Sequence, residues 1–504
     1  MGTLWGRPFN AAGGLDGGWA EVDSPPARAY NDSAVPITRR SFLSSLAVAP
    51  AIAKRRRTNV VVFLTDDHGP WATSVSGCSE MVTPAFTRLA SQGTRFSRAF
   101  ACTPVCSPSR LTLMSGLIPS QHGVQDWLVP ADSFGPKSTR YLENRLTWSD
   151  VLARNGYTLG MAGKWHMGHD DTAQSGFSYW ATIPGGGGTY KNPVLVKNGK
   201  TIPMQGFKTD LVGDCALEFL DSQKNSQSPF ALYMPFYAPH TPLDYQPDKY
   251  REPYGGSKFS CYPNTPLHPW QNRGLNAHHG NTQSKLGYSA LITAADANMR
   301  RVLEKLEQMG AMEDTLVLFT ADQGWNAGHH GLWGKGNGSV PFNMYEESIG
   351  VPMVWSHPGR IAAGRVESGM VSHYDVVPTL LDYLGLPYSP SGFRAGASYA
   401  PLLRGRSMKQ RDRLFFEYGP VRAVRTGTHK LIRRASGEDE FFDLSADPRE
   451  TTNRWNDPAY AKQRASLDAS LEAFFKRAGA PALADWKTTT KQNLTVYRRA
   501  AALQ

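Results

Sequence analysis

Long apolar runs alternate with amphipathic segments over most of the chain. Residues 59–65 (NVVVFLT) are β-branched and apolar almost without interruption, which is typical of a strand buried on both faces of a parallel sheet. Comparable runs occupy residues 157–163, 230–239 and 315–321. Each run ends at charged or polar side chains, so we expect the carboxyl ends of these strands to gather them at one edge of a sheet.

Helical patterns separate these strands. One covers residues 83–92 and is closed by Gly93, and another runs from Cys106 to Gly116. A long amphipathic helix precedes residue 315, with apolar positions at Leu291, Ile292, Met299, Val302, Leu303 and Leu306. The alternation predicts an α/β fold built on a large, doubly wound, mainly parallel sheet.

The pattern changes near residue 405 to short strands split by turn residues, followed by a helix at about 458–477. The expected strands are Arg413–Tyr418, Val421–Thr426, His429–Arg433 and Glu440–Leu444. This predicts a smaller C-terminal domain of antiparallel sheet plus helix. The predicted division is therefore a leader at 1–57, the α/β domain at 58–404 and the C-terminal domain at 405–504.

Composition narrows the class of protein. The chain has 504 residues, 40% of them hydrophobic and 19% charged, and is long enough to bury a large core. A net charge of +11 suits an anionic substrate and does not require nucleic acid as a partner. The five cysteines are too scattered for a disulfide framework or a zinc site. One disulfide is compatible with the sequence, which does not choose the pair.

The N-terminal segment has the features of an export signal. Thr38–Leu43 (TRRSFL) resembles the twin-arginine motif and precedes a short apolar stretch that ends in Ala51–Ala53, a small-x-small cleavage pattern. We expect the export machinery as a partner, a periplasmic or secreted location and no stable membrane anchor, since the stretch is shorter than the ~20 residues a span needs. The basic run at 54–57 leaves nuclear or polyanion binding open as an alternative.

Acidic and amide residues follow two of the predicted strands. Asp66 and Asp67 end the first, and Asp322 and Gln323 end the run at 315–321. Their oxygens are the ligands that Ca²⁺ or Mg²⁺ prefers. Either pair alone could equally be a turn former or helix cap, but two pairs at strand ends favour a metal site.

Cys106 stands at the predicted start of a helix. Pro108 suits the first helical turn and Gly116 the helix end, so the thiol should lie where a helix N-terminus attracts a phosphate or sulfate. A buried structural cysteine beside a helix end is the alternative from these residues alone.

The string at 106–116 (CSPSRLTLMSG) resembles the sulfatase signature. Residues 163–168 (GKWHMG) are similar to the GKWHLG segment of that family. His240 in FYAPHTP, Lys335 in GLWGKG and the segment at 371–387 match further family segments in the same order. Ser115 stands where the family more often has threonine, and Gln323 replaces the common asparagine.

The resemblance implies that Cys106 is converted to formylglycine by a formylglycine-generating enzyme. It also implies one divalent cation held by Asp66, Asp67, Asp322 and Gln323 together with the group at position 106. Ca²⁺ suits such irregular oxygen sets better than Mg²⁺ does.

The resemblance further implies hydrolysis of a sulfate ester, with a formylglycine hydrate at position 106 as nucleophile. Arg110 would help to polarise that group, Lys164 and Lys335 would bind the sulfate, His240 would protonate the leaving oxygen and His166 would accept a proton during sulfate release. Apart from the resemblance, His329 and His330 could be substrate contacts or simple loop histidines. We expect at least one of them, His330, to contact substrate because loops carry specificity. The expected substrate is a sulfated carbohydrate. A phosphomonoester or phosphonate monoester hydrolase of the alkaline phosphatase superfamily, and an inactive sulfated-glycan binding protein, remain open.

Overall fold

Strand β1 (Asn59–Thr65) lies in the middle of a large sheet, as expected for a run of apolar residues buried on both sides. The computed structural model describes residues 57–485. β1 pairs in parallel with β7 (Phe230–Pro235) on one side and with β8 (Thr315–Ala321) on the other. The predicted α/β fold with a mainly parallel sheet is confirmed.

The sheet has eleven strands, and its order is β12-β2-β11-β8-β1-β7-β3-β4-β5-β6, with β13 paired to β2. β11 runs antiparallel to both β2 and β8, and β5 runs antiparallel to β4 and β6. The bounds of the remaining strands are Gly93–Phe100 (β2), Thr158–Gly163 (β3), Tyr179–Thr182 (β4), Val194–Lys197 (β5), Lys200–Pro203 (β6), Gly350–Ser356 (β11), Arg365–Glu367 (β12) and Val371–Ser372 (β13).

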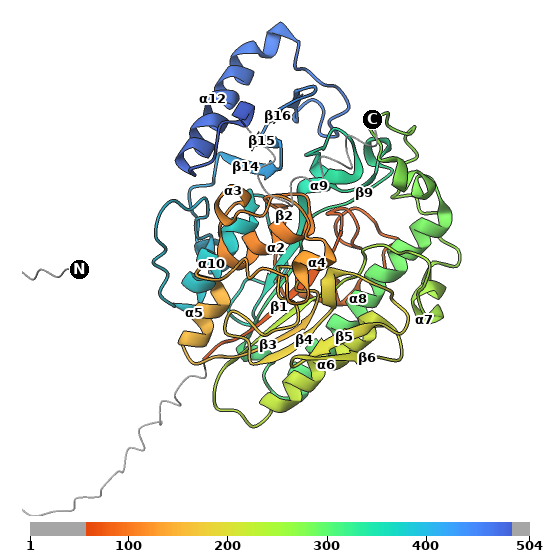
Figure 1. Cartoon of the computed structure of the whole chain (residues 1–504), viewed down its shortest axis with the longest axis vertical. Helices are drawn as coiled ribbons and strands as arrows, with labels where there is room; N and C mark the ends of the chain where they lie inside the picture. Colours follow the sequence, from red (N-terminus) through yellow and green to blue (C-terminus); the bar gives the residue numbers. More distant parts are fainter. Residues whose placement is uncertain (1–56, 486–504) are drawn as a thin grey trace, which may run out of the picture. The chain divides into compact units, whose positions relative to one another are not determined.

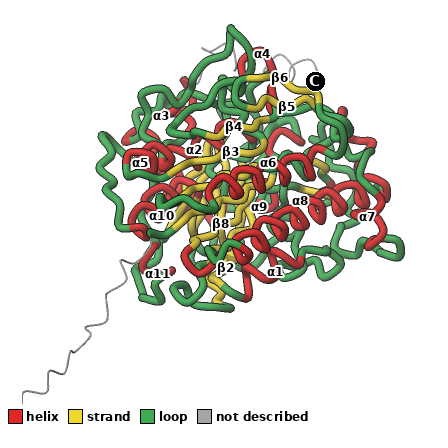
Figure 2. The backbone as a smooth tube through the Cα atoms, turned by 90° about the horizontal axis from the view of Figure 1, so that it is seen from below, coloured by secondary structure: helices red, strands yellow, loops and turns green. Residues whose placement is uncertain are grey.

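Helices cover both faces of this sheet (Figure 2). One core cluster packs α1 (Pro84–Ser91), α6 (Lys208–Gln223) and α8 (Thr282–Gln308) on one face. A second packs α2 (Cys106–Ser115), α5 (Trp148–Arg154) and α10 (Val376–Leu384) on the other. The shorter helices are α3 (Pro119–His122), α4 (Pro130–Ser133), α7 (Asp248–Arg251), α9 (Glu346–Ile349) and α11 (Ala400–Leu403), and β9 (Asn326–Ala327) pairs with β10 (Trp333–Gly334).

The C-terminal part forms a separate four-stranded antiparallel sheet with one long helix (Figure 1). Its strands are β14 (Arg413–Tyr418), β15 (Val421–Thr426), β16 (His429–Arg434) and β17 (Glu440–Asp443), and its helix is α12 (Ala461–Arg477). A shared core cluster joins this sheet to residues of the large domain that include Phe100 and Met344. The division of the chain at residues 404 and 405 stays a prediction.

A disulfide joins Cys78 to Cys261, a pairing that the sequence left open. Glu80 reinforces the same junction, because its carboxylate accepts hydrogen bonds from the hydroxyls of Ser257 and Ser260. The segment after residue 255 is thereby fastened to the loop between β1 and α1.

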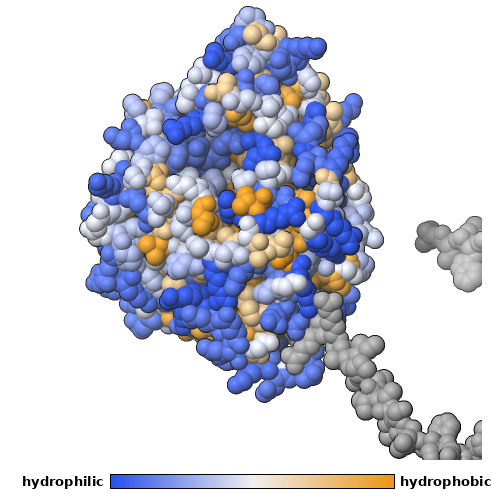
Figure 3. Space-filling model, turned by 180° about the vertical axis from the view of Figure 1, so that it is seen from behind, coloured by the Kyte–Doolittle hydropathy of each residue, from blue (hydrophilic) through white to orange (hydrophobic). Residues whose placement is uncertain are grey.

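The export motif and its cleavage site lie outside the described residues, so the predicted location stays untested. Within residues 57–485, no helix has the length and apolar character needed to cross a membrane. On the face drawn in Figure 3, hydrophobic residues lie in small patches among polar ones.

Candidate active site

Two strand ends place three carboxylates side by side. Because β1 and β8 are parallel, with Thr65 paired to Ala321, the residues that follow them emerge at the same edge. Asp66, Asp67 and Asp322 are buried, and one carboxylate oxygen from each lies within 4.8 Å of the others. The backbone N–H of Asp67 also donates to Asp322 Oδ1 at 3.2 Å. The structure therefore brings the predicted acidic residues together.

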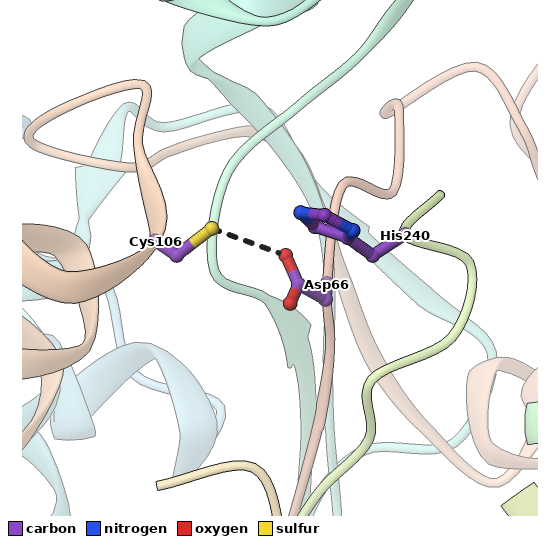
Figure 4. A group of neighbouring side chains, drawn as sticks. All are labelled: Asp66, Cys106 and His240. Atoms are coloured by element: carbon purple, nitrogen blue, oxygen red, sulfur yellow. Dashed lines mark hydrogen bonds between the residues drawn. The ribbon is translucent and has the colours of Figure 1, made fainter. Parts of the chain in front are cut away.

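Helix α2 presents Cys106 to this cluster. The preceding Val105 is extended, and Gly116 ends the helix at a φ of 70°, a left-handed conformation that suits glycine. Figure 4 shows the side chains of Cys106, Asp66 and His240 pointing toward one another from three segments of the chain. Cys106 Sγ lies 3.4 Å from Asp66 Oδ1.

Three cations surround the thiol and the carboxylates. Lys335 Nζ lies 2.8 Å from Cys106 Sγ and 2.6 Å from Asp67 Oδ1. Arg110 donates from Nε to Asp322 Oδ2 at 2.9 Å, and Lys164 Nζ pairs with Asp66. All three cations are buried, so these ion pairs act where water screens little.

The cations change the acidity of their neighbours. Burial and Asp66 raise the pKa of the Cys106 thiol, but Lys164, Lys335 and a hydrogen bond from His240 outweigh them and lower it to about 6. Burial also opposes ionisation of Asp66, yet the surrounding cations, Lys164 foremost, hold that pKa well below its usual range. A group at position 106 is therefore held in an environment that favours negative charge.

Asp67 and Asp322 behave differently from Asp66. Burial raises both of their pKa values, and Lys335 and Arg110 offset it only in part. The described cations therefore do not fully compensate for the burial of negative charge in this carboxylate cluster.

The donor atoms fit a divalent cation. Gln323 Oε1 is buried without a hydrogen-bond partner, while its Nε2 donates to Asp67 Oδ1. Turning the amide over would bring a fourth oxygen to the three carboxylates, and such hard oxygen donors suit Ca²⁺ or Mg²⁺. Gln323 therefore lies where the predicted ligand should.

His240 and His166 differ in which ring nitrogen is hydrogen-bonded to the backbone. His240 follows β7 and has 26% of its side chain exposed, with Nε2 3.7 Å from Asp67 Oδ2. Its Nδ1 lies 2.7 Å from the carbonyl oxygen of Thr241, which requires a proton on Nδ1. Nε2 is therefore the nitrogen that can exchange a proton at the site.

His166 has the opposite arrangement. Its Nε2 lies 2.8 Å from the carbonyl oxygen of Leu128, and its buried Nδ1 has no hydrogen-bond partner. Burial, together with Lys164, lowers its pKa well below the usual value. His166 is thus a neutral imidazole with a free lone pair on Nδ1.

His330 contacts residues at the start of α9. Its Nε2 lies 2.8 Å from Glu347 Oε2, and its ring stacks on Tyr345 with centroids 4.2 Å apart. Its role in substrate binding stays a prediction.

Three residues near the site were not predicted from the sequence. Asp126 is buried, accepts a hydrogen bond from the Tyr418 hydroxyl at 2.8 Å, and has a pKa that burial raises to about 7. Lys208 and Tyr237 contact the glycine run at 185–188 and the ring of His240, respectively. Tyr237 belongs to the FYAPHTP segment but was not assigned a role there. Asp126 and Lys208 are related to the chemistry only by proximity in the fold, so no local motif could have singled out those two.

Comparisons with known proteins agree with these features. A family model described as Sulfatase matches residues 58–386, and one described as N-sulphoglucosamine sulphohydrolase, C-terminal, matches residues 328–477. An N-acetylglucosamine-6-O-sulfatase of Bacteroides thetaiotaomicron is 26% identical, over 85% of this chain and 89% of that protein. Arylsulfatase A of Homo sapiens is 29% identical, over 81% of this chain and 80% of that protein.

A solved structure of a protein in complex with its substrate, D-glucosamine-2-N,6-O-disulfate, superposes on this chain with a TM-score of 0.73. Its sequence is 24% identical, and the match covers 86% of this chain and 100% of that one. At this identity the likeness establishes the fold.

Proposed function

This chain belongs to the sulfatase family of sulfuric ester hydrolases, and from that premise we propose that it hydrolyses a carbohydrate sulfate ester, with formylglycine at position 106 and a divalent cation. The observation that carries the proposal is the position of Cys106. Its Sγ lies 2.8 Å from Lys335 Nζ and 3.4 Å from Asp66 Oδ1, so position 106 adjoins both the cationic and the carboxylate groups of the site.

Two groups complete the proposed site. Formylglycine formed from Cys106 would supply an aldehyde hydrate as oxygen nucleophile. A cation held by Asp66, Asp67, Asp322 and Gln323, together with the group at position 106, would supply positive charge that favours the ionised nucleophile. We favour Ca²⁺ over Mg²⁺ because it tolerates irregular oxygen sets.

The chain's own cations are suited to bind the sulfate. Lys335 and Lys164 reach position 106 and Asp66 from different segments, so their ammonium groups can bind oxygens of a sulfate placed between them and offset the charge that develops there. Arg110 is anchored by Asp322, and its fixed charge contributes to the same field.

The histidines are suited to move protons at different steps. His240 is partly exposed and has Nε2 toward the site, so a proton on Nε2 can pass to the leaving oxygen. His166 offers the Nδ1 lone pair from a buried, neutral ring, so it can accept a proton when sulfate is released. The two roles use different ring nitrogens, Nε2 of His240 and Nδ1 of His166, because each ring uses its other nitrogen for a backbone carbonyl.

The proposal of a carbohydrate substrate has support from relatives. One of them is an N-acetylglucosamine-6-O-sulfatase and another is an ulvan-active sulfatase of Formosa agariphila, 26% identical over 82% of this chain. The same proposal includes export through the twin-arginine machinery and modification by a formylglycine-generating enzyme. The Cys78–Cys261 disulfide supports export, because disulfides persist mainly in oxidising compartments.

The experiment is mass spectrometry of the tryptic peptide 99–110 from protein coexpressed with a formylglycine-generating enzyme, combined with sulfate-release assays. We expect a loss of about 18 Da at position 106, as thiol-to-aldehyde conversion requires. We also expect release from N-acetylglucosamine 6-sulfate faster than from choline sulfate, and 4-nitrophenyl sulfate cleaved faster than 4-nitrophenyl phosphate. An unmodified Cys106, with a control substrate modified normally, would overturn the proposed nucleophile, and preference for phosphate would overturn the proposed reaction.

A further inference from the structure

The first residue of α6 is a buried lysine next to the proposed site. Lys208 is 1% exposed, and no carboxylate of residues 57–485 lies within ion-pair distance of its ammonium group. Burial, with a further contribution from Lys164, lowers its pKa to about 7, although the charge of Asp66 acts in the opposite direction. A buried ammonium group that forms no ion pair is costly to maintain. Its presence therefore suggests a function, and its contacts indicate which one.

One set of contacts holds the glycine run at 185–188. Lys208 Nζ donates to the carbonyl oxygens of Gly187 at 3.0 Å and Gly188 at 2.7 Å. Gly186, in the same run, packs directly on the imidazole of His166, since a Cβ built there would lie 2.2 Å from Cδ2 of that ring. Lys208 therefore fixes the segment that forms one wall against His166.

The other contact leads to His240. Lys208 Nζ lies 4.0 Å from the centroid of the Tyr237 ring, within the range of a cation–π interaction. The Tyr237 ring stacks on His240, with centroids 4.8 Å apart and planes 27° apart. The backbone of His240 is held as well, because the Tyr190 hydroxyl donates to its carbonyl oxygen at 2.8 Å.

We propose that Lys208 is a positioning residue that orients both His166 and His240, through the glycine run at 185–188 and the Tyr237 ring. This inference rests on the proton-transfer roles proposed for the two histidines. One ammonium group contacts both supports and neither imidazole, so its loss should misplace the proton donor and acceptor. Lys164 also lies over the Tyr237 ring, 5.3 Å from its centroid, but its ion pair with Asp66 and that of Lys335 with Asp67 should keep the sulfate-binding cations in place. Displacements of this kind reduce turnover more than substrate binding.

The test compares Lys208→Met and Lys208→Gln with wild type, each with formylglycine occupancy measured by mass spectrometry. We expect kcat to fall about 10- to 100-fold in Lys208→Met, with KM changed less than about threefold, and Lys208→Gln to lie in between because its amide can still donate. Hydrogen–deuterium exchange should become faster in peptides covering residues 184–190. The thermal midpoint should change little, because the loss of two hydrogen bonds is offset by the removal of a costly buried charge.

Lys191→Met is the matched control, since Lys191 also places its ammonium over a tyrosine ring, 5.5 Å from the centroid of Tyr245, but is exposed. Its activity and exchange should equal those of wild type. Wild-type kcat in Lys208→Met with unchanged exchange at 184–190 would overturn the inference, as would a raised KM with unchanged kcat.

If Lys208→Met does not fold, Lys208→Gln is judged by the same measurements. If formylglycine-bearing wild type releases no sulfate, the proposed function fails. The exchange measurement then decides separately whether Lys208 holds the glycine run.

Discussion

At the scale of single residues, the site depends on what stands at position 106. Cys106→Ser places one hydroxyl in the same surroundings of Lys335 and Asp66. If that hydroxyl took up the sulfuryl group, no second hydroxyl would be present to expel it. We therefore expect at most one molecule of desulfated alcohol formed per enzyme and no free sulfate, together with a wild-type content of divalent cation measured by elemental analysis.

Cys102→Ala is the matched control, because Cys102 is a free, buried cysteine in the same tryptic peptide. It should keep steady-state turnover. Multiple turnovers by Cys106→Ser at the wild-type rate would contradict the prediction.

Asp126 offers a residue-scale test of buried charge. Burial raises its pKa to about 7, above the value of about 3.9 in an unfolded chain. Between these values the folded protein holds a proton that the unfolded chain has released, so this carboxyl's contribution to stability is lost as the pH rises from about 4 to 7.

Asp126→Asn removes that titration. As the pH rises from 5 to 7, we expect the free energy of unfolding of the variant to increase relative to that of wild type by up to about 1.4 kcal/mol per pH unit. This is seen as a growing difference in thermal midpoint. Tyr418→Phe, which deletes the hydrogen bond that lowers this pKa, should extend the pH-dependent loss to higher pH. Parallel pH profiles for wild type and Asp126→Asn would show that Asp126 is ionised throughout.

At the scale of elements, the sequence predicted the helices and strands that have a strong pattern of hydrophobic and polar positions. β1 and β8 have the expected bounds, and α2 begins at Cys106 and ends at Gly116 as expected. β2 was not predicted, because its sequence GTRFSRAF mixes polar and apolar residues, a pattern typical of an exposed segment. It is a strand because β11 pairs along it, and Gly93 allows a close approach that a Cβ would block, 2.2 Å from the Trp355 carbonyl oxygen.

The same holds for the candidate site, where the residues that belong to a local sequence pattern were predicted and the others were not. Side chains within strand-end and helix-start motifs, such as Asp66, Asp322 and Cys106, were identified because each belongs to a local pattern. Asp126 and Lys208 act through contacts with distant segments, and a single sequence carries no signal for such contacts.

The N-terminus of helix α1 is capped by a side chain of another helix. Its N-cap residue Thr83 makes no side-chain capping bond, because its hydroxyl bonds to Ser74. Instead, Asp296 on α8 accepts the backbone N–H groups of Ala85 and Phe86, both at 2.8 Å. The free N–H groups of a helix start need such acceptors.

Asp296→Ala should lower the free energy of unfolding by about 1–3 kcal/mol, since it leaves two buried donors unpaired. The thermal midpoint measures this loss. Glu304→Ala on the same helix removes only an exposed pair with Arg300 and should cost less than about 1 kcal/mol. Equal effects of the two substitutions would contradict the proposed capping.

At the scale of the whole molecule, the C-terminal sheet holds the segment that follows Lys335. Arg434 on β16 donates to the carbonyl oxygen of Phe342, and Lys430 on the same strand donates to that of Met344 at 2.8 Å. Lys430 also pairs with Glu346 at 3.0 Å and with Glu450. The two parts of the chain are thus joined close to a proposed sulfate-binding lysine.

Lys430→Met tests this coupling. Lys430 is fully buried between Glu346 and Glu450. Its removal leaves Glu450 without its cation and Glu346 with Arg425 alone, and should cost about 3–5 kcal/mol in the free energy of unfolding. Because the backbone at Met344 also loses its donor, we expect weaker substrate binding through displacement of Lys335, seen as a raised KM. Thermal midpoints and steady-state kinetics measure the two effects.

Adding Glu450→Gln to Lys430→Met separates charge from packing. The double variant has one unpaired carboxylate fewer, so it should regain part of the lost stability, and the shortfall from additivity gives the coupling energy between the two side chains. Arg413→Ala removes an exposed pair with Asp412 on the same sheet and should change neither quantity appreciably. A Lys430→Met variant that unfolds earlier but keeps the wild-type KM would show that the C-terminal sheet stabilises the fold without positioning Lys335.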